Sequence, residues 1–208
     1  MNRRVVVADT SSTSETRCGE SGFAISRSQI DAATVEVLNR GGWANPDVLL
    51  LELADGRRVV VKDYQPRGRL LRSTFGRWVL GREARAYRKL AGVRGVPALL
   101  GQVDPLALVI EYRPGRILSR SLAGELPEGF VTELHEMVGE MHARGVVHLD
   151  LRHRSNVLAG NDGHPVLIDF ASAVFAHPDG VIARCLQRID ALALRKWKRK
   201  LSSDPGTR

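Results

Sequence analysis

The chain has 208 residues, 43% of them hydrophobic and 26% charged, and its 31 basic and 23 acidic side chains give a formal net charge of +8. This length fits one domain or two small lobes and excludes a larger assembly of domains, while the apolar content excludes a wholly disordered chain. The apolar runs are no longer than strands, so we expect neither a transmembrane segment nor a secretory signal. The two cysteines form no metal-binding or disulfide pattern, which favours a cytoplasmic protein.

Arginine carries most of the positive charge, because only five of the 31 basic residues are lysines. Such a charge indicates either a solvated basic surface or an anionic substrate or partner, and charge alone does not choose between them. The scarcity of lysine makes each lysine outside the C-terminal tail worth attention, Lys62 in particular.

The first half of the chain predicts an antiparallel sheet that carries one helix. Residues 1–24 are rich in Ser, Thr, Glu and Gly and lack a hydrophobic period, which predicts a mobile N-terminal arm. A basic connection over residues 66–72 leads into a helix predicted over residues 73–90. Alternating apolar residues and turn signals predict strands over residues 33–38, 47–53, 57–63, 96–103 and 106–112.

The second half is predicted to be mostly helical. Apolar residues recur at helical spacing from Phe130 to Met141, which predicts a helix that ends near Gly145. A loop over residues 146–155, a small hairpin with strands at residues 157–158 and 166–168, and a last helix over residues 182–201 follow. The expected fold class is therefore α+β in two lobes, with an N-lobe over residues 25–112 and a smaller C-lobe over residues 113–208.

Two motifs place carboxylates beside strongly apolar runs. They are Val-His-Leu-Asp-Leu-Arg-His-Arg-Ser-Asn-Val-Leu at residues 147–158 and Pro-Val-Leu-Ile-Asp-Phe at residues 165–170. Asp150, Asn156 and Asp169 supply only oxygen ligands and a potential base, a set that suits Mg²⁺ holding a polyphosphate. The alternative is that both acids cap helices or close turns, but the combined pattern is more specific than a single carboxylate.

A second pair of charged residues lies upstream. Glu83 shares a predicted helix face with Leu80, Tyr87 and Leu90, and a lone carboxylate on an apolar stripe requires a cation. Lys62, in an apolar strand, is well placed to supply one. Either residue alone would be read as a solvated surface group, but their order relative to the acidic motifs favours a pair.

Together these residues resemble the protein-kinase-like superfamily over residues 35–200. The resemblance implies a two-lobed kinase fold, ATP and Mg²⁺ as cofactors, and transfer of a phosphoryl group to a hydroxyl. It implies that Asp150 is the catalytic base and that Asn156 and Asp169 hold Mg²⁺. Lys62 and Glu83 would position the nucleotide.

The remaining roles implied by the resemblance are less sharply marked in the sequence. Arg152 is the candidate for touching the transferring phosphate, with Arg154 as its competitor. Gly41 and Gly42 stand where the family has a glycine-rich loop over the phosphates. The segment that joins the lobes would meet the adenine through its backbone, at Glu111 and Tyr112.

Several departures from the pattern narrow the resemblance. Asn156 is six residues after Asp150 rather than five, Leu149 stands where an arginine is usual, and only 39 residues follow Asp169. These features are similar to those of compact atypical kinases, namely the RIO family and the bacterial kinases of the lipopolysaccharide core that act on Kdo or heptose. The Arg-Ile-Asp sequence at residues 188–190 resembles the closing helix of that group.

Three functions follow from this resemblance. The leading one is a RIO-like serine/threonine protein kinase, and the first alternative is a kinase for a lipopolysaccharide sugar or another small molecule. The second alternative is a pseudokinase or nucleotide-binding scaffold, favoured by the extra residue before Asn156 and the short glycine loop. The basic tail at residues 195–200 could contact an anionic lipid or RNA, although a docked helix with Trp197 in the core accounts for it more simply.

Overall fold

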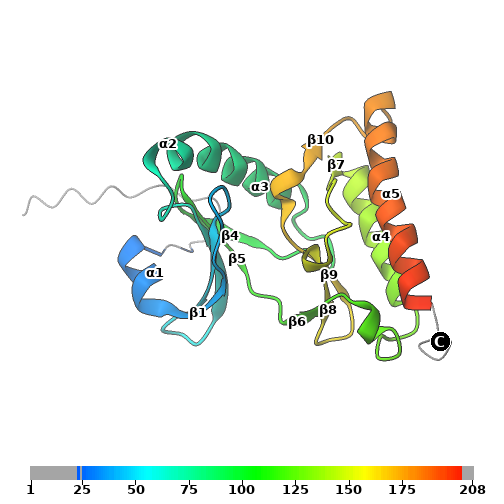
Figure 1. The fold of residues 1–208 in the computed structure, drawn as a ribbon, viewed down its shortest axis with the longest axis horizontal. Helices are drawn as coiled ribbons and strands as arrows, with labels where there is room; N and C mark the ends of the chain where they lie inside the picture. The colour runs from blue at the N-terminus through cyan, green and yellow to red at the C-terminus, as the bar shows by residue number, and fades with distance from the viewer. Residues whose placement is uncertain (1–22, 24, 203–208) are drawn as a thin grey trace, which may run out of the picture.

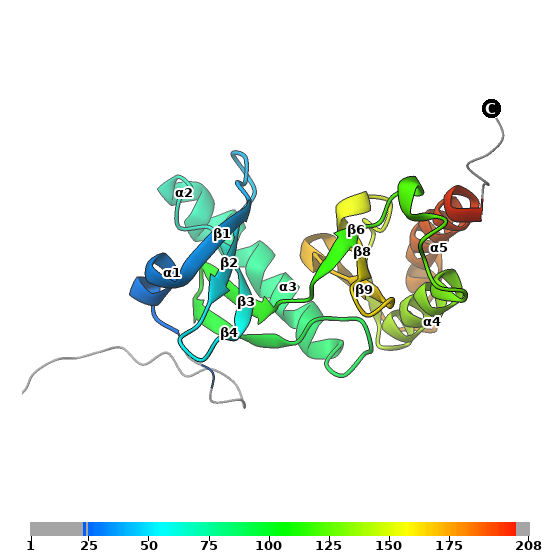
Figure 2. The same cartoon turned by 90° about the horizontal axis from the view of Figure 1, so that it is seen from below.

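The computed structural model describes residue 23 and residues 25–202. The predicted mobile arm, residues 1–24, lies outside the described residues except for Phe23. The α+β class with an antiparallel sheet is confirmed. Figures 1 and 2 show two groups of elements side by side, one built on a five-stranded sheet and the other on two long helices.

The larger sheet is antiparallel with the strand order β1-β2-β3-β5-β4. In the pair β2–β3, residue 47 lies opposite residue 63 and residue 52 opposite residue 58, so the turn at Asp55 and Gly56 closes a regular hairpin. The strands are β1 (Thr34–Asn39), β2 (Asp47–Glu52), β3 (Arg58–Asp63), β4 (Leu99–Asp104) and β5 (Ala107–Glu111).

Two helical features of this first half differ from the prediction. The helix expected over residues 73–90 begins earlier, as α2 (Arg69–Leu71) and a π-helical turn, η1 (Arg72–Gly76), before α3 (Arg77–Lys89). The short helix α1 (Arg27–Ala33) is absent from the prediction because it buries only Ile30 and so has no hydrophobic period. Its signal was the capping box, in which Ser26 and Gln29 bond reciprocally.

The second half contains more strand than the prediction of one small hairpin. A three-stranded sheet has the order β6-β8-β9, and β7 pairs with β10. These strands are too short, at two to four residues, to show an alternating pattern. The elements are β6 (Gly115–Ile117), η2 (Arg120–Leu122), α4 (Phe130–Ala143), β7 (Val146–Val147), η3 (Arg154–Asn156), β8 (Val157–Gly160), β9 (Pro165–Leu167), η4 (Phe170–Ser172), β10 (Val174–Phe175) and α5 (Val181–Ser202).

One hydrophobic cluster joins the two halves. It runs from Val60 on the sheet through Leu80 and Tyr87 on α3 to Met141 on α4 and Trp197 on α5. Trp197 is 2% exposed, which confirms a docked terminal helix. A smaller cluster covers the other face of the sheet beneath α1.

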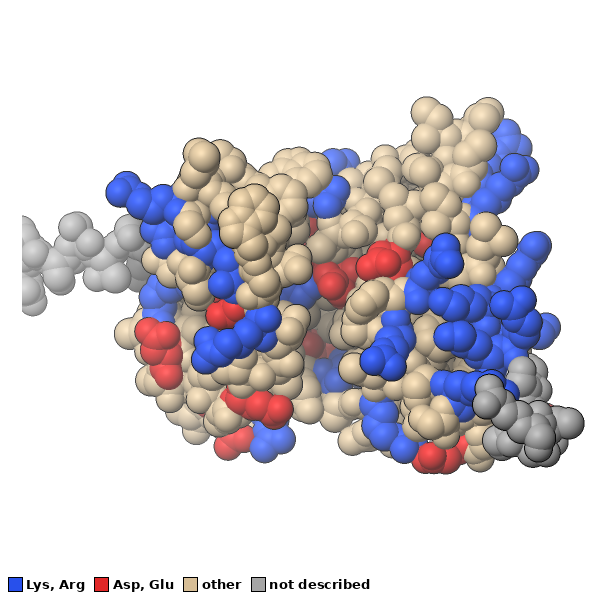
Figure 3. All heavy atoms as spheres, viewed as in Figure 1, with Lys and Arg blue, Asp and Glu red and all other residues tan. Residues whose placement is uncertain are grey.

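Charge is unevenly distributed over the face drawn in Figure 3. Acidic side chains gather between the two groups of elements, and basic ones gather over α5 and at the α2 end of the sheet. None of the helices within the described residues combines the length and apolarity needed to cross a membrane.

Candidate active site

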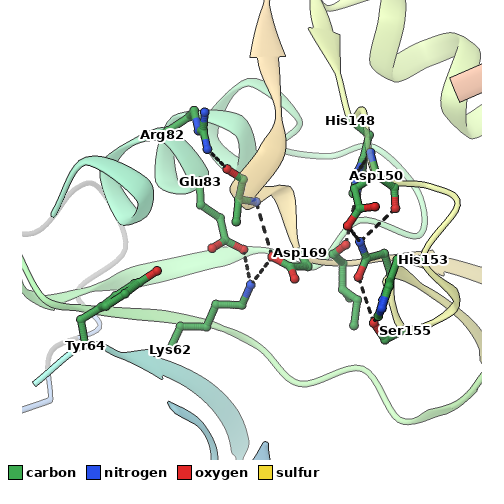
Figure 4. Close-up of polar contacts among 12 residues, drawn as sticks. Lys62, Tyr64, Arg82, Glu83, His148, Asp150, His153, Ser155 and Asp169 are labelled. Atoms are coloured by element: carbon green, nitrogen blue, oxygen red, sulfur yellow. Dashed lines mark hydrogen bonds and ion pairs between the residues drawn. The ribbon is translucent and has the colours of Figure 1, made fainter. Parts of the chain in front are cut away.

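Lys62 and Glu83 form a buried ion pair, and the half-exposed Asp169 completes the charge cluster around the lysine. Strand β3 is flanked by β2 and β5, and this central position in the sheet leaves Lys62 only 7% exposed. Its Nζ donates to Oε1 of Glu83 at 2.6 Å and to Oδ1 of Asp169 at 2.8 Å (Figure 4). The ion pair expected between Lys62 and Glu83 is therefore present, and Asp169 is a further partner from 107 residues along the chain.

The three charges control each other's protonation. Burial lowers the pKa of Lys62, but the negative charges of Glu83 and Asp169 outweigh it and raise that pKa above the usual value. Burial raises the pKa of Glu83, and the Lys62 charge opposes this effect. The pKa of Asp169 is lowered, first by Lys62 and then by hydrogen bonds, against the effect of burial. Asp169 is thus held as a carboxylate.

Asp150 and Asn156 form a second polar pair in the segment between β7 and β8. Nδ2 of Asn156 donates to the main-chain oxygen of Asp150 and to its Oδ2, both at 3.0 Å. Asn156 ends the 3₁₀ turn η3, and next to it Oγ of Ser155 lies 2.5 Å from Nδ1 of His153 and 3.2 Å from Oδ1 of Asn156. In Figure 4, Asp169 lies between Asp150 and Lys62.

Backbone strain is concentrated at the same place. Among the described residues, Leu149 and Asp169 are the non-glycine residues with positive φ, at 67° and 65°. This left-handed conformation is costly for a side chain with a Cβ and persists where surrounding bonds enforce it. Leu149 is directly before Asp150, so the strain sets the direction in which the segment presents that carboxylate.

Asp190 of α5 supplies the enforcing bonds at Leu149. Its two carboxylate oxygens accept from the backbone N–H groups of His148 and Leu149, each at 2.9 Å. Nε2 of His142 lies 2.9 Å from the same carboxylate. Asp190 has no exposed surface, so these buried hydrogen bonds attach the segment that carries Asp150 to α5.

His148 links the two acidic motifs directly. Its Nδ1 accepts from the N–H of Asp150 at 3.3 Å, and its Nε2 donates to the carbonyl of Ile168 at 3.2 Å. Nδ1 can accept only when it is unprotonated, so this geometry requires the neutral ring. Burial lowers the pKa of His148, in agreement with that requirement.

The turn that contains Gly41 and Gly42 is held by residues that follow β3. A Cβ on Gly41 would lie 2.2 Å from the carbonyl oxygen of Asn45, so the turn requires glycine there. Tyr64 donates its hydroxyl to the carbonyl of Ala44 at 3.2 Å, and Arg67 donates to the carbonyl of Asn45 at 2.7 Å. Burial raises the pKa of Tyr64 to about 12, which keeps the hydroxyl a donor.

The other predicted site residues join neither polar group. The Glu111 carboxylate accepts from the N–H of Ala98 and pairs with Arg113, and the Glu111 N–H donates to the Ala98 carbonyl. Tyr112 is partly buried against the core. Arg152 and Arg154 are exposed.

Asp190, Tyr64 and Arg67 are among the residues of this arrangement that were absent from the predicted site. Asp190 had a detectable signal, a lone acid on the buried stripe formed by residues 183, 193, 194 and 197 of the last helix. Tyr64 and Arg67 had none, because a turn 20 residues upstream reaches them only through the folding of the sheet.

Within the described chain, no group of three or more His, Cys, Asp or Glu side chains is arranged to hold a metal ion. Two cavities, of about 180 and 280 Å³, lie beside α4 and β8, and Lys62, Asp150 and Asp169 line neither of them.

Comparison with known proteins finds one local similarity. A stretch of 73 residues is 40% identical to the serine/threonine-protein kinase RIM15 of Saccharomyces cerevisiae. The match covers 32% of this chain and 4% of that much longer protein. No family model matches the chain. The similarity is to part of a protein kinase and indicates a kinase-like segment.

Proposed function

We propose that the protein is an ATP- and Mg²⁺-dependent phosphotransferase with a reduced two-lobed kinase-like fold and a hydroxyl acceptor. The observation that carries the proposal is the position of Lys62 between Glu83 and Asp169, next to the hydrogen-bonded pair Asp150 and Asn156. Burying the charges of Lys62 and Glu83 is costly, and a function that uses the ammonium group and the neighbouring carboxylate of Asp169 explains why they are kept.

The donor set fits a magnesium ion. Mg²⁺ is usually bound through one or two protein oxygens together with water and substrate phosphates. Asp169, held as a carboxylate, and the amide oxygen of Asn156 are the residues that would hold it. When bound, the ion supplies neutralisation of the phosphate charge during transfer. Lys62, fixed by Glu83, would position the nucleotide phosphates.

Asp150 is the proposed base for the acceptor hydroxyl. In the reaction the acceptor oxygen forms a bond to the γ-phosphorus of ATP while the bond to the β-phosphate oxygen breaks, and ADP leaves. The hydroxyl proton passes to the Asp150 carboxylate, which the Asn156 amide orients. Positioning and charge neutralisation carry most of this catalysis.

Replacement of Asp169 by Ala tests the metal role. We expect loss of Mg²⁺-dependent phosphoryl transfer from labelled ATP, with the fold retained by circular dichroism. Asp162→Ala, in the exposed turn between β8 and β9, is the matched control. Undiminished transfer by Asp169→Ala would contradict the metal assignment.

Replacement of Asp150 by Asn tests the base. We expect ATP binding to be retained and transfer to fall by about 10²-fold or more, because the amide no longer takes up the proton. The acceptors to compare are the protein itself, a generic protein substrate and purified lipopolysaccharide core. Transfer to protein favours the RIO-like function and transfer to the core favours the sugar kinase. A wild-type protein that binds ATP but transfers to none of them favours the scaffold.

A further inference from the structure

A group of apolar side chains is exposed at the start of the helix that carries Glu83. Leu70 of α2 is 80% exposed, Trp78 of α3 is 59% exposed, and Phe75 of η1 is also exposed. The rings of Phe75 and Trp78 lie 6.1 Å apart. Phe75 and Trp78 are three residues apart, so they share a side of the helical stretch.

The turn between β1 and β2 brings a second exposed tryptophan to the same end of the sheet. Trp43 is 85% exposed. Its neighbours Ala44 and Asn45 are bonded to Tyr64 and Arg67, which lead directly into α2. The α2–α3 patch is defined here by the apolar residues Trp43, Leu70, Phe75 and Trp78 and the exposed arginines Arg69 and Arg77.

The charged residues of the segment that carries the patch are all arginines. Residues 66–82 contain five arginines and no aspartate or glutamate. Of these five, Arg67 is paired with Asp47, while Arg69 and Arg77 are exposed. Figure 3 shows basic atoms beside uncharged ones at this end of the molecule. The patch therefore offers apolar side chains for burial and positive charge for an anionic partner.

We propose that the α2–α3 patch binds the surface of a membrane that contains anionic lipid. Helices with exposed Trp, Phe and Leu beside arginines lie in the plane of the lipid interface, where the apolar groups enter the acyl boundary and the arginines meet headgroup phosphates. Tryptophan suits this position because its ring is apolar and its N–H is polar. The proposal is independent of phosphoryl transfer.

The arrangement of the rings favours lipid over single-stranded nucleic acid. Bases stack on open aromatic faces, but the guanidinium of Arg82 lies over the ring of Trp78, 4.1 Å from its centroid. Leu70, among the most exposed side chains of the patch, provides no stacking surface, yet it gains free energy on entering an acyl layer.

Tryptophan fluorescence provides the direct test, because the third tryptophan, Trp197, is buried and hydrogen-bonded to the Leu151 carbonyl. The full chain is mixed with vesicles of phosphatidylcholine alone or with phosphatidylglycerol added. With the anionic vesicles we expect a blue-shifted emission, quenching by brominated acyl chains, and sedimentation with the vesicles that weakens as salt is raised. No shift and no sedimentation would overturn the proposal.

Two pairs of variants locate the surface. Leu70→Ser with Trp78→Ser should lower the partition coefficient by at least about tenfold, since two large apolar groups no longer enter the lipid. The matched control is Ile182→Ser with Leu192→Ser on α5, whose side chains are exposed to a similar degree. Arg69→Gln with Arg77→Gln should lower the partition coefficient by about fivefold for each arginine replaced. The control for this pair is Arg57→Gln with Arg58→Gln, at the turn between β2 and β3.

Each contrary result is also decisive. Larger effects from the α5 pair than from the patch pair would assign membrane binding to α5 and overturn the proposal. Equal binding to neutral and anionic vesicles would remove the role of the arginines. Binding of labelled single-stranded RNA that the patch variants abolish, without vesicle binding, would identify a nucleic-acid surface instead. Thermal unfolding at the wild-type temperature would show that the variants are folded.

Discussion

At the scale of single residues, the site depends on one ammonium group that forms ion pairs with two carboxylates. Lys62 has two acidic partners at 2.6 and 2.8 Å, and removal of the lysine would leave Glu83 buried without a counter-charge. Loss of one member of such a cluster typically costs about 3–5 kcal/mol. The sequence predicted the pair with Glu83, because an acid on an apolar stripe requires a cation. It did not predict that Asp169 completes the cluster.

His148 is a residue whose protonation affects folding. The folded state holds its ring neutral, between an N–H donor at Asp150 and a carbonyl acceptor at Ile168. Burial lowers the pKa of His148 from 6.5. The unfolded chain therefore takes up a proton at a higher pH than the folded protein does. The stability from the neutral ring is fully present above about pH 6.5 and is lost as the pH falls towards the folded-state pKa.

The predicted consequence is a pH-dependent free energy of unfolding. Between pH 7.5 and 5.5 the wild-type protein should lose stability more steeply than His148→Gln, by up to about 1.4 kcal/mol per pH unit. Glutamine can also accept and donate at this site but does not titrate, and the other five histidines are common to both proteins. Urea unfolding at each pH measures the difference, and parallel curves would refute the prediction.

At the scale of elements, the π-helical turn η1 shapes the approach to α3. It places Gly76 against the ring of Tyr64, so that a Cβ there would lie 2.8 Å from Cγ of that ring. Tyr64 is 1% exposed and cannot move aside, and its hydroxyl holds the turn that contains Gly41 and Gly42. Packing at one glycine thus connects the start of the Glu83 helix to that turn.

Two glycine substitutions separate packing from helix propensity. Gly76→Ala should destabilise the protein by about 1–3 kcal/mol, because the added methyl group displaces Tyr64. Gly81→Ala, one and a half turns later in α3 with open space around it, should stabilise by up to about 1 kcal/mol. Denaturant unfolding of both variants gives the comparison. Equal effects at the two positions would show that the contact with Tyr64 is unimportant.

At the scale of the whole molecule, a few polar contacts join the sheet half to the helical half. Lys62 donates to Asp169, and Arg82 donates to the carbonyl of Ala171. Within the helical half, Trp197 of α5 donates to the carbonyl of Leu151. Asp190 of α5 also accepts from the backbone N–H groups of His148 and Leu149, and it lies 2.9 Å from Nε2 of His142 on α4. The candidate site therefore lies where these halves meet. Helix α5 contacts it through the hydrogen bonds of Asp190 to the segment before Asp150.

The Asp190→Asn variant tests this support. The amide keeps one acceptor but turns a donor towards backbone N–H groups, so we expect a loss of about 2–4 kcal/mol in unfolding free energy. Backbone amides of His148 and Leu149 should also exchange with deuterium faster, as measured by mass spectrometry. Asp179→Asn, in an exposed loop, should change stability by less than about 0.5 kcal/mol. Unchanged exchange at residues 148 and 149 would remove Asp190 from this role.

Much of the fold was predictable from the sequence in those segments where the pattern of apolar residues extends over many positions. The five strands of the large sheet, α3, α4 and α5 were expected within a few residues of their observed bounds, because each repeats its apolar period several times. The strands β6, β7 and β10 and the helix α1 were missed, because two to seven residues do not show a period. The three strands depend on partners distant in the chain, whereas the capping box of α1 is a local signal.

The sequence by itself determined the chemistry that this protein can present: Lys62, Glu83, Asp150, Asn156 and Asp169, in an order and in local patterns that resemble a kinase. These are properties of neighbouring residues, and periodicity and local polarity reveal them. Only the tertiary structure decided that Asp169 shares Lys62, that Asp190 strains Leu149, and that Tyr64 holds the glycine turn. The reason is that contacts between residues 20 to 107 positions apart form only when the core between the sheet and the helices has closed.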